Sequence, residues 1–125
     1  MTENQISRIV FDKALTVHKA LGPGLLESAY EECLVHELRK ENLTVERQKP
    51  LPLIYNDVNL STGYRIDIII ESKVILEIKA VESIIDIHKA QLLTYLRLSN
   101  CKLGMLINFN VMLIKDGIRR VVNGL

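Results

Sequence analysis

A chain of 125 residues with 48% apolar and 25% charged side chains suits one globular domain over residues 1–125, and this composition excludes a disordered chain. The 16 basic and 15 acidic residues give a formal net charge of +1, which excludes the strong overall basic field of a non-specific nucleic-acid binder. Any affinity for nucleic acid must therefore come from a local patch of charge.

The cysteines and the N-terminus indicate a reduced, cytoplasmic protein. Cys33 and Cys101 stand far apart and belong to no CxxC or Cys/His pattern, so we expect no disulfide framework, structural zinc or iron–sulfur cluster. The N-terminus has no basic-then-apolar signal pattern. No apolar run approaches the roughly 20 residues that span a bilayer, so we expect no membrane partner.

Two amphipathic helices are predicted in the first third of the chain. Apolar residues recur at helical spacing over residues 6–21, and a Gly-Pro-Gly sequence follows at 22–24. A second helix is predicted from Leu25 to Glu41, with Asn42 ending it and with Glu31 on its charged, solvated face.

Strand patterns begin after this helix. Residues 45–55 contain two prolines, which cannot donate to a β-ladder, so we expect an edge or interrupted strand before a turn at 56–57. Residues 64–71 and 74–80 are rich in β-branched side chains and predict a tight antiparallel hairpin, with Ser72-Lys73 between its strands.

The last third of the chain predicts a helix over residues 83–98 and a fully buried strand over 103–109. A final hairpin is predicted within 111–122, turning at Asp116-Gly117. Strands followed by a helix and a further strand predict an α/β layer structure with a mixed sheet.

Three charged residues lie in the most apolar hairpin of the chain. Because side chains alternate along a strand, Glu77 and Lys79 in VILEIKA point to one face, and Asp67 sits among isoleucines on the preceding strand. Burying an unpaired charge costs several kcal/mol, so such groups are normally paired or bound to a metal.

Two carboxylates on adjacent strands suit Mg²⁺ or Mn²⁺, with water and substrate phosphate completing the coordination. Lys79 would orient or help deprotonate a metal-bound water, or stabilise the charge that develops on phosphorus. The alternative is a structural ion pair on a half-exposed sheet face, because a D…ExK spacing also recurs by chance.

Two other segments add candidate residues. Gln91 and Tyr95 are four apart on the helix after the hairpin and share a face, from which they would bind phosphate or water. The alternative is an ordinary surface glutamine and a tyrosine at the edge of the core. His88 shares that face but is expected to be solvated or to cap the helix. Glu27 lies in a first helical turn, where the helix dipole alone favours a carboxylate.

The segments GLLESAY, GYRIDIII, LEIKA, QLLTY and LINFN, in this order between about Val10 and Val122, resemble the GxxExxY protein family, a prokaryotic group of the PD-(D/E)xK nuclease superfamily. The resemblance implies a restriction-endonuclease-like core of helix, three strands, helix and strand (αβββαβ). It implies that Asp67, Glu77, the Ile78 carbonyl and Glu27 hold the metal, with Lys79 as the catalytic lysine.

Gln91 and Tyr95 are similar to the QxxxY pattern of the lambda-exonuclease and RecB-like branch, which often acts on DNA ends. Ile66 stands where the superfamily's name has proline, a position at which that proline is often missing. The cysteine cluster of some RecB-like nucleases does not occur in the sequence.

The leading hypothesis is a Mg²⁺- or Mn²⁺-dependent enzyme that hydrolyses DNA, rather than RNA, phosphodiester bonds. The alternative is a non-catalytic nucleic-acid-binding or accessory subunit that retains the fold, which the near-neutral charge and small size favour. A toxin–antitoxin or other protein-interaction module has no positive feature in the sequence. A homodimer is expected only by analogy with other small nucleases.

Overall fold

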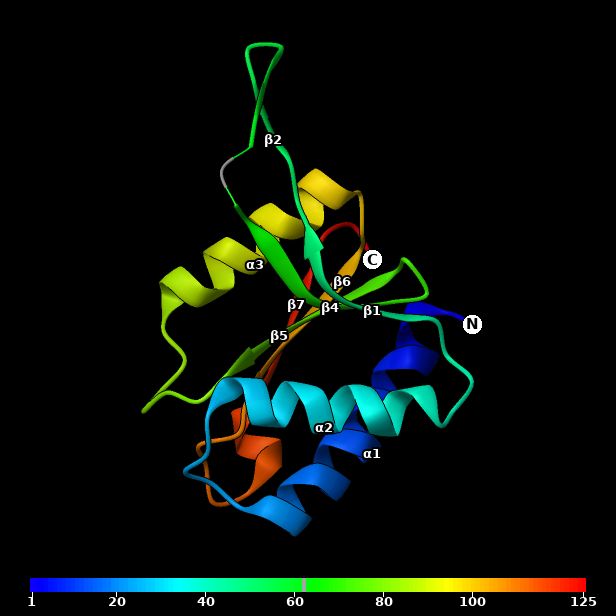
Figure 1. The fold of residues 1–125 in the computed structure, drawn as a ribbon, viewed down its shortest axis with the longest axis vertical. Coiled ribbons are helices and arrows are strands. Elements are labelled where there is room, and N and C mark those ends of the chain that lie inside the picture. The colour runs from blue at the N-terminus through cyan, green and yellow to red at the C-terminus, as the bar shows by residue number, and fades with distance from the viewer. Residues whose placement is uncertain (62) are drawn as a thin grey trace.

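The computed structural model describes residues 1–61 and 63–125, which form a central β-sheet with helices on both faces and a projecting hairpin (Figure 1). The helices are α1 (Glu3–Leu21), α2 (Glu27–Arg39), α3 (Asp86–Ser99) and the short 3₁₀ helix η1 (Ile114–Gly117). The strands are β1 (Val45–Pro50), β2 (Leu53–Tyr55), β3 (Val58–Leu60), β4 (Arg65–Ile70), β5 (Val74–Lys79), β6 (Leu103–Asn108) and β7 (Ile118–Val122).

The main sheet is mixed, with the strand order β1-β4-β5-β6-β7. Strands β5 and β6 are parallel and are joined through α3, whereas the other three pairs are antiparallel. The order α2, β1, β4, β5, α3, β6 is the αβββαβ core of a restriction-endonuclease-like fold, so the predicted fold class is confirmed. Helix α1, the β2–β3 hairpin and β7 are additions to this core.

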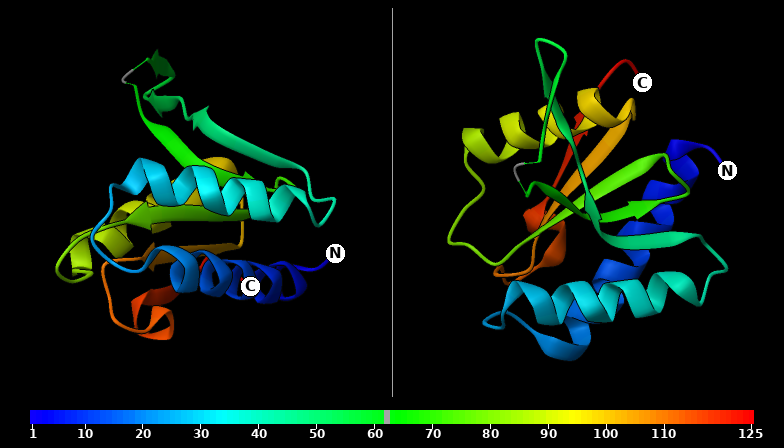
Figure 2. Two further views of the ribbon diagram at one scale, coloured as in Figure 1. Left: turned by 60° about the horizontal axis from the view of Figure 1, so that its bottom comes forward. Right: turned by 45° about the horizontal axis from the view of Figure 1, so that its top comes forward.

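The sheet has a hydrophobic core on each face. Helices α1 and α2 cover one face and α3 covers the other (Figure 2). Side-chain alternation along β5 explains the division: Leu76 and Ile78 pack toward α1 and α2, while Ile75 packs with Leu92 of α3. Glu77 is two residues after Ile75 and points to the same face of β5. All six residues of β6 are buried, as predicted for that strand.

The helices agree with the predicted segments, with shifted ends. Helix α1 begins at Glu3, because Thr2 and Gln5 form a capping box, and it stops at Gly22, whose φ is +69°. Helix α2 begins at Glu27 and ends at Arg39, two residues inside the predicted segment at each end. None of the helices in the described part of the chain combines the length and apolar character that a membrane crossing requires.

The proline-rich segment is an interrupted edge strand, as predicted. β1 pairs with β4 as far as Pro50, and the chain then leaves the main sheet to form the separate β2–β3 hairpin. Asn56 and Asp57 occupy its turn, both with positive φ, and the hairpin projects away from the sheet (Figure 1). The β4–β5 turn has positive φ at Glu71 and Ser72, one residue earlier than predicted.

The predicted hairpin within residues 111–122 is wrong. Residues 114–117 form η1, and the single strand β7 pairs with β6. Gly117 does not adopt the left-handed conformation of a tight hairpin turn. It is instead required by close packing, because a Cβ atom there would clash with the backbone oxygen of Asn108.

Replacing Gly117 with alanine is therefore expected to lower the free energy of unfolding by about 2–3 kcal/mol, since backbone rather than a movable side chain opposes the added methyl group. Urea unfolding monitored by circular dichroism measures this loss. Lys115→Ala, an exposed position on the same short helix, is the control and should change stability by less than about 0.5 kcal/mol. Equal stability of the two variants would contradict the packing argument.

Candidate active site

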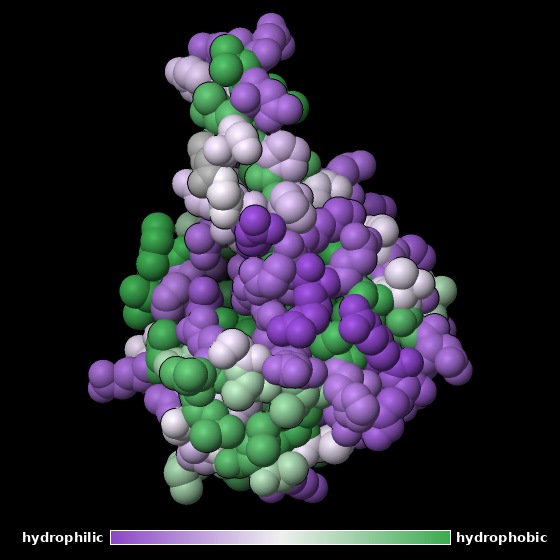
Figure 3. Space-filling model, viewed as in Figure 1, coloured by the Kyte–Doolittle hydropathy of each residue, from purple (hydrophilic) through white to green (hydrophobic). Residues whose placement is uncertain are grey.

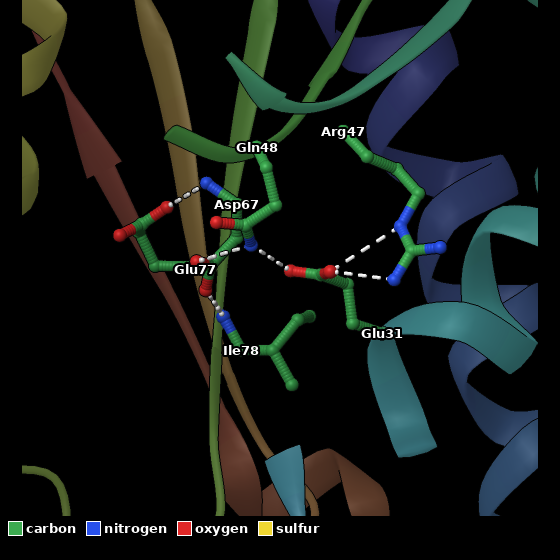
Figure 4. Close-up of polar contacts among 6 residues, drawn as sticks. All are labelled: Glu31, Arg47, Gln48, Asp67, Glu77 and Ile78. Atoms are coloured by element: carbon green, nitrogen blue, oxygen red, sulfur yellow. Dashed lines mark hydrogen bonds and ion pairs between the residues drawn. The ribbon is translucent and has the colours of Figure 1, made fainter. Parts of the chain in front are cut away.

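A gap opens between β4 and β5 at the predicted carboxylates. The pairing of the two strands runs from Ile70↔Val74 to Ile68↔Leu76, and Asp67 and Glu77 would form the next pair. There the peptide N–H of Asp67 donates to Glu77 Oε2 at 2.8 Å, and the N–H of Ile78 donates to Asp67 Oδ2 at 2.9 Å (Figure 4). Each carboxylate thus replaces a ladder bond by binding the backbone of the opposite strand; we call this place the β4–β5 gap.

The gap arises because each strand continues with a different partner. β4 stays paired with β1 through Arg65↔Pro50, while β5 stays paired with β6 through Lys79↔Asn108. Backbone N–H groups exposed by the separation need acceptors, and a carboxylate supplies a strong one. The sequence therefore places acids where the strands part, and their oxygens lie between the strands.

Burial makes both carboxylates harder to ionise. Desolvation, followed by the charge of Asp67, raises the pKa of Glu77 to about 8, although the Asp67 N–H and Lys79 act in the opposite direction. Desolvation also raises the pKa of Asp67, and the hydrogen bond from the Ile78 N–H is the largest effect that lowers it. Glu77 is only 5% exposed, so its negative charge has little access to water.

No protein cation neutralises this pair at close range. In residues 1–61 and 63–125, no lysine or arginine nitrogen lies within 4.0 Å of an Asp67 or Glu77 oxygen. Lys79 is half-buried and close enough to lower the pKa of both carboxyls. The predicted alternative of a direct structural ion pair with Lys79 is therefore not what the structure contains.

The donor set fits a small hard cation. Two carboxylates that repel each other are favourable ligands for Mg²⁺ or Mn²⁺, which keep several waters and take one or two protein carboxylates. Over the described residues, no three His, Cys, Asp or Glu side chains are grouped tightly enough to hold a metal together. The protein thus offers two strong ligands and leaves the remaining positions to carbonyl oxygen, water or substrate.

Glu27 lies beside this pair without touching it. Its Oε2 accepts the N–H of Ala80 at 3.2 Å, just beyond the end of β5. A surface hollow of about 280 Å³ connects the α2 acids with the carboxylate of Asp67, and we call it the acidic hollow; its lining is Glu27, Ser28, Glu31, Gln48, Asp67 and Ile78.

The tyrosine of GLLESAY has a structural role. Tyr30 is fully buried, its hydroxyl donates to the Gly22 carbonyl at 2.6 Å, and the same oxygen accepts the N–H of Leu25 at 3.1 Å. Its ring stacks on Phe109 with 4.4 Å between centroids. Tyr30 therefore fixes the α1–α2 connection that brings Glu27 to the end of β5.

The two residues predicted on α3 lie in different environments. Tyr95 is 6% exposed, and burial, then the charges of Glu77 and Asp67, raise the pKa of its phenol, so it lies within electrostatic reach of both carboxylates. Gln91 is exposed and lines a separate groove of about 540 Å³ between α3 and the β2–β3 side of the molecule. His88 accepts the N–H of Ile85 at 3.2 Å and caps α3, one of the two roles expected for it.

Comparison with models of known protein families places the chain in a superfamily. The sequence model of the PD-(D/E)XK nuclease superfamily matches residues 4–121, which is nearly the whole chain. The chain belongs to the PD-(D/E)XK nuclease superfamily. No curated protein and no solved structure matches it. Nucleases of this superfamily generally use divalent metals such as Mg²⁺, and membership implies a nucleic-acid substrate.

This PD-(D/E)XK chain contains polar residues near the site that the sequence did not reveal. Glu31, predicted on a solvated face, is 5% exposed; Arg47 donates to its Oε2 from Nε at 3.3 Å and from Nη2 at 2.9 Å. Gln48 donates to Glu31 Oε1 at 2.8 Å (Figure 4). Glu31 lies one helical turn after Glu27, a spacing that could have identified it, whereas no sequence signal marks Gln48.

Proposed function

We propose that this chain is a Mg²⁺- or Mn²⁺-dependent deoxyribonuclease whose metal is held by Asp67 and Glu77. The observation that carries the proposal is the β4–β5 gap, which holds two carboxylates of raised pKa and, among the described residues, no lysine or arginine nitrogen at ion-pair distance from them. A divalent cation would remove the mutual repulsion and the cost of burying both charges. The signature letters of the superfamily match Asp67 and the run Glu77-Ile78-Lys79 in order.

The backbone carbonyl of Ile78 and the carboxylate of Glu27 are the further proposed ligands. Both residues line the acidic hollow with Asp67, and Glu27 can reach the cation through a bridging water. When bound, the metal supplies Lewis-acid polarisation of the phosphate and a water of lowered pKa.

Lys79 is the proposed catalytic lysine. It lies on β5 with the parity of Glu77, and its ammonium lowers the pKa of both carboxyls, so its charge acts at the same place. There it would stabilise the charge that develops on the phosphate or orient the attacking water. Tyr95 would donate a hydrogen bond from its phenol to the phosphate. Gln91 would bind the DNA strand in the groove beside α3.

Three finer assignments are part of the proposal: DNA rather than RNA as substrate, membership of the GxxExxY family, and kinship with the RecB and lambda-exonuclease branch.

A homodimer is proposed as well. Exposed apolar side chains lie on the β2–β3 hairpin, at Ile54 and Val58, and on the α1–α2 connection, at Leu25 and Leu26. Figure 3 shows apolar surface on the projecting hairpin. Sedimentation equilibrium of the purified chain tests the dimer.

The catalytic proposal is tested by incubating the protein with labelled single- and double-stranded DNA, and with RNA of the same sequence, with Mn²⁺ or with a chelator. We expect cleavage of DNA only with metal. Lys79→Ala should lower the rate by at least about 100-fold, a typical loss when a group stabilising developing charge is removed. Lys102→Ala, an exposed lysine outside the gap, is the matched control and should cleave like the wild type. Equal rates for the wild type and Lys79→Ala would refute the proposal.

The second candidate is a non-catalytic nucleic-acid-binding subunit that retains the fold. The observation that favours it is that, over the described residues, no three His, Cys, Asp or Glu side chains are grouped tightly enough to hold a metal together. Fluorescence anisotropy in the presence of chelator separates the candidates. Tight DNA binding without metal, together with no cleavage in Mn²⁺, would support the second candidate over the first.

A further inference from the structure

Gln48 has an unusual backbone for a residue within a strand. Its φ is +49°, and the paired residues Arg47↔Ile68 and Lys49↔Ile66 flank it in the β1–β4 ladder, opposite Asp67. A side chain with a Cβ atom adopts this left-handed conformation at a steric cost. The other non-glycine residues with positive φ in the described chain all lie in turns: Asn42, Asn56, Asp57, Glu71, Ser72 and Asn100.

The left-handed backbone brings two neighbouring side chains onto one carboxylate. Consecutive residues of a regular strand point to opposite faces, so Arg47 and Gln48 would normally diverge. Here Arg47 binds Oε2 of Glu31 and Gln48 binds Oε1 of the same group (Figure 4). Because Glu31 is almost completely buried and held by both, it is a fixed anchor for the Gln48 amide.

The same amide faces Asp67. Nε2 of Gln48 lies 2.8 Å from Glu31 Oε1 and 3.4 Å from Asp67 Oδ1, so the bond to the anchor is short and the contact with Asp67 is long. The other oxygen of Asp67 accepts the Ile78 N–H at 2.9 Å. The Ile78 N–H therefore holds Oδ2 by a short bond, while the Gln48 amide faces Oδ1 at a distance that leaves this oxygen available to a further ligand.

We propose that Gln48 is a positioning residue, anchored by Glu31 and Arg47, that holds the Asp67 carboxylate ready for the divalent cation. This inference rests on the metal site of the proposed function. Donors behind a metal ligand orient it and raise metal affinity by about 10–100-fold. A neutral amide suits the task, because it orients the carboxylate without supplying a positive charge that would compete with the metal. The backbone of Gln48, at φ +49°, is sterically strained, and this conformation places its amide between Glu31 and Asp67.

Gln48→Gly separates positioning from strand stability, because glycine adopts positive φ freely and lacks the amide. Asn56→Gly is the matched control, since Asn56 has a similar φ of +48° in the distant β2–β3 turn. In metal-free protein, we expect the Ile78 amide to exchange hydrogen about 10-fold faster in Gln48→Gly than in the wild type. The amides of Leu51 and Glu71, whose bonds to Tyr64 and Thr44 lie beyond either end of the β1–β4 pairing, should keep their protection.

Calorimetric titration with MnCl₂ is the second measurement, and we expect Gln48→Gly to bind Mn²⁺ about 10-fold more weakly than the wild type and Asn56→Gly. Should Gln48→Gly fail to fold, Gln48→Asn tolerates positive φ but is too short to reach both carboxylates, and the same two losses are expected.

Unchanged Ile78 exchange, or equal loss of protection at Leu51 and Glu71, would overturn the inference. So would wild-type Mn²⁺ affinity in a folded Gln48 variant. Mn²⁺ binding by a wild type that cleaves no DNA refutes the proposed function alone. If the wild type binds no Mn²⁺, the metal site fails, and the exchange rate of Ile78 still decides whether Gln48 positions Asp67.

Discussion

Glu77→Gln is expected to stabilise the metal-free protein at pH 8 and to abolish metal-dependent cleavage of DNA. Glu77 is buried, and desolvation together with the Asp67 charge raises its pKa to about 8, so ionising it costs folding free energy. An amide has the same shape, can still accept the Asp67 N–H through its oxygen, and carries no charge. The expected gain is on the order of 1–3 kcal/mol, which corresponds to a melting temperature higher by roughly 3–10 °C.

Loss of function should accompany this gain in stability. The amide cannot neutralise a divalent cation, so we expect Mn²⁺ affinity to fall beyond calorimetric detection and cleavage to fall by at least about 1,000-fold. Glu82→Gln, an exposed glutamate shortly after β5, is the control and should change neither property. Thermal unfolding and cleavage assays measure the two effects on one preparation. A Glu77→Gln protein that is less stable than the wild type and still active would refute both parts.

The second large effect is the pH dependence of stability. In the folded state the pKa of Glu77 is about 8, against 4.5 for an ordinary glutamate, so between these values the folded protein binds more protons than the unfolded chain. Stability is then fully present below about pH 4.5 and falls as pH rises toward 8. We expect the metal-free protein to lose roughly 2–4 kcal/mol of unfolding free energy over this window.

Divalent metal should cancel this loss. A cation binds the ionised carboxylates, so Mg²⁺ or Mn²⁺ should stabilise the protein strongly at pH 8 and weakly at pH 5. The gain is about 2.7 kcal/mol when free metal is 100 times the dissociation constant. Urea unfolding at both pH values, with metal or with chelator, measures the difference. The same gain from metal at pH 5 and at pH 8, or none at either, would be inconsistent with a cation at Glu77.

Local patterns predicted most of the fold. Helical periodicity located α1, α2 and α3 to within three residues at each end, and the apolar run at 103–109 predicted a strand buried on both faces. The hairpin turn predicted at Asp116-Gly117 was wrong, because an Asp-Gly pair indicates only that the backbone can adopt a tight turn. At Gly117 the constraint is contact with Asn108, a residue nine positions earlier, and no local pattern records that contact.

The candidate site was predicted in part. The alternation in VILEIKA predicted that Glu77 and Lys79 share a face, and the apolar surroundings of Asp67 marked it as a site residue. The β-branched runs predicted a tight antiparallel hairpin but not where its pairing ends. β4 and β5 separate at these acids because each continues with its own third strand. Parting of this kind depends on pairing with distant segments, which periodicity does not record.

The network around Glu31 lay beyond prediction for a related reason. Glu31 has a charged neighbour, Glu32, and its position in the sequence resembles that of any solvated helix face. It is buried because β1 packs against α2 and brings Arg47, 16 positions away, to its carboxylate. The sequence also does not predict the positive φ of Gln48, because glycine and asparagine, not glutamine, are the residues that indicate such a backbone.

The most direct test of the metal site is a crystal of the protein soaked in millimolar MnCl₂ and measured at a wavelength where manganese scatters anomalously. The account predicts one strong anomalous peak in the β4–β5 gap, about 2.0–2.3 Å from a carboxylate oxygen of Asp67 and of Glu77. An empty gap, with Asp67 and Glu77 still bound to the backbone N–H groups of Ile78 and Asp67, would contradict it.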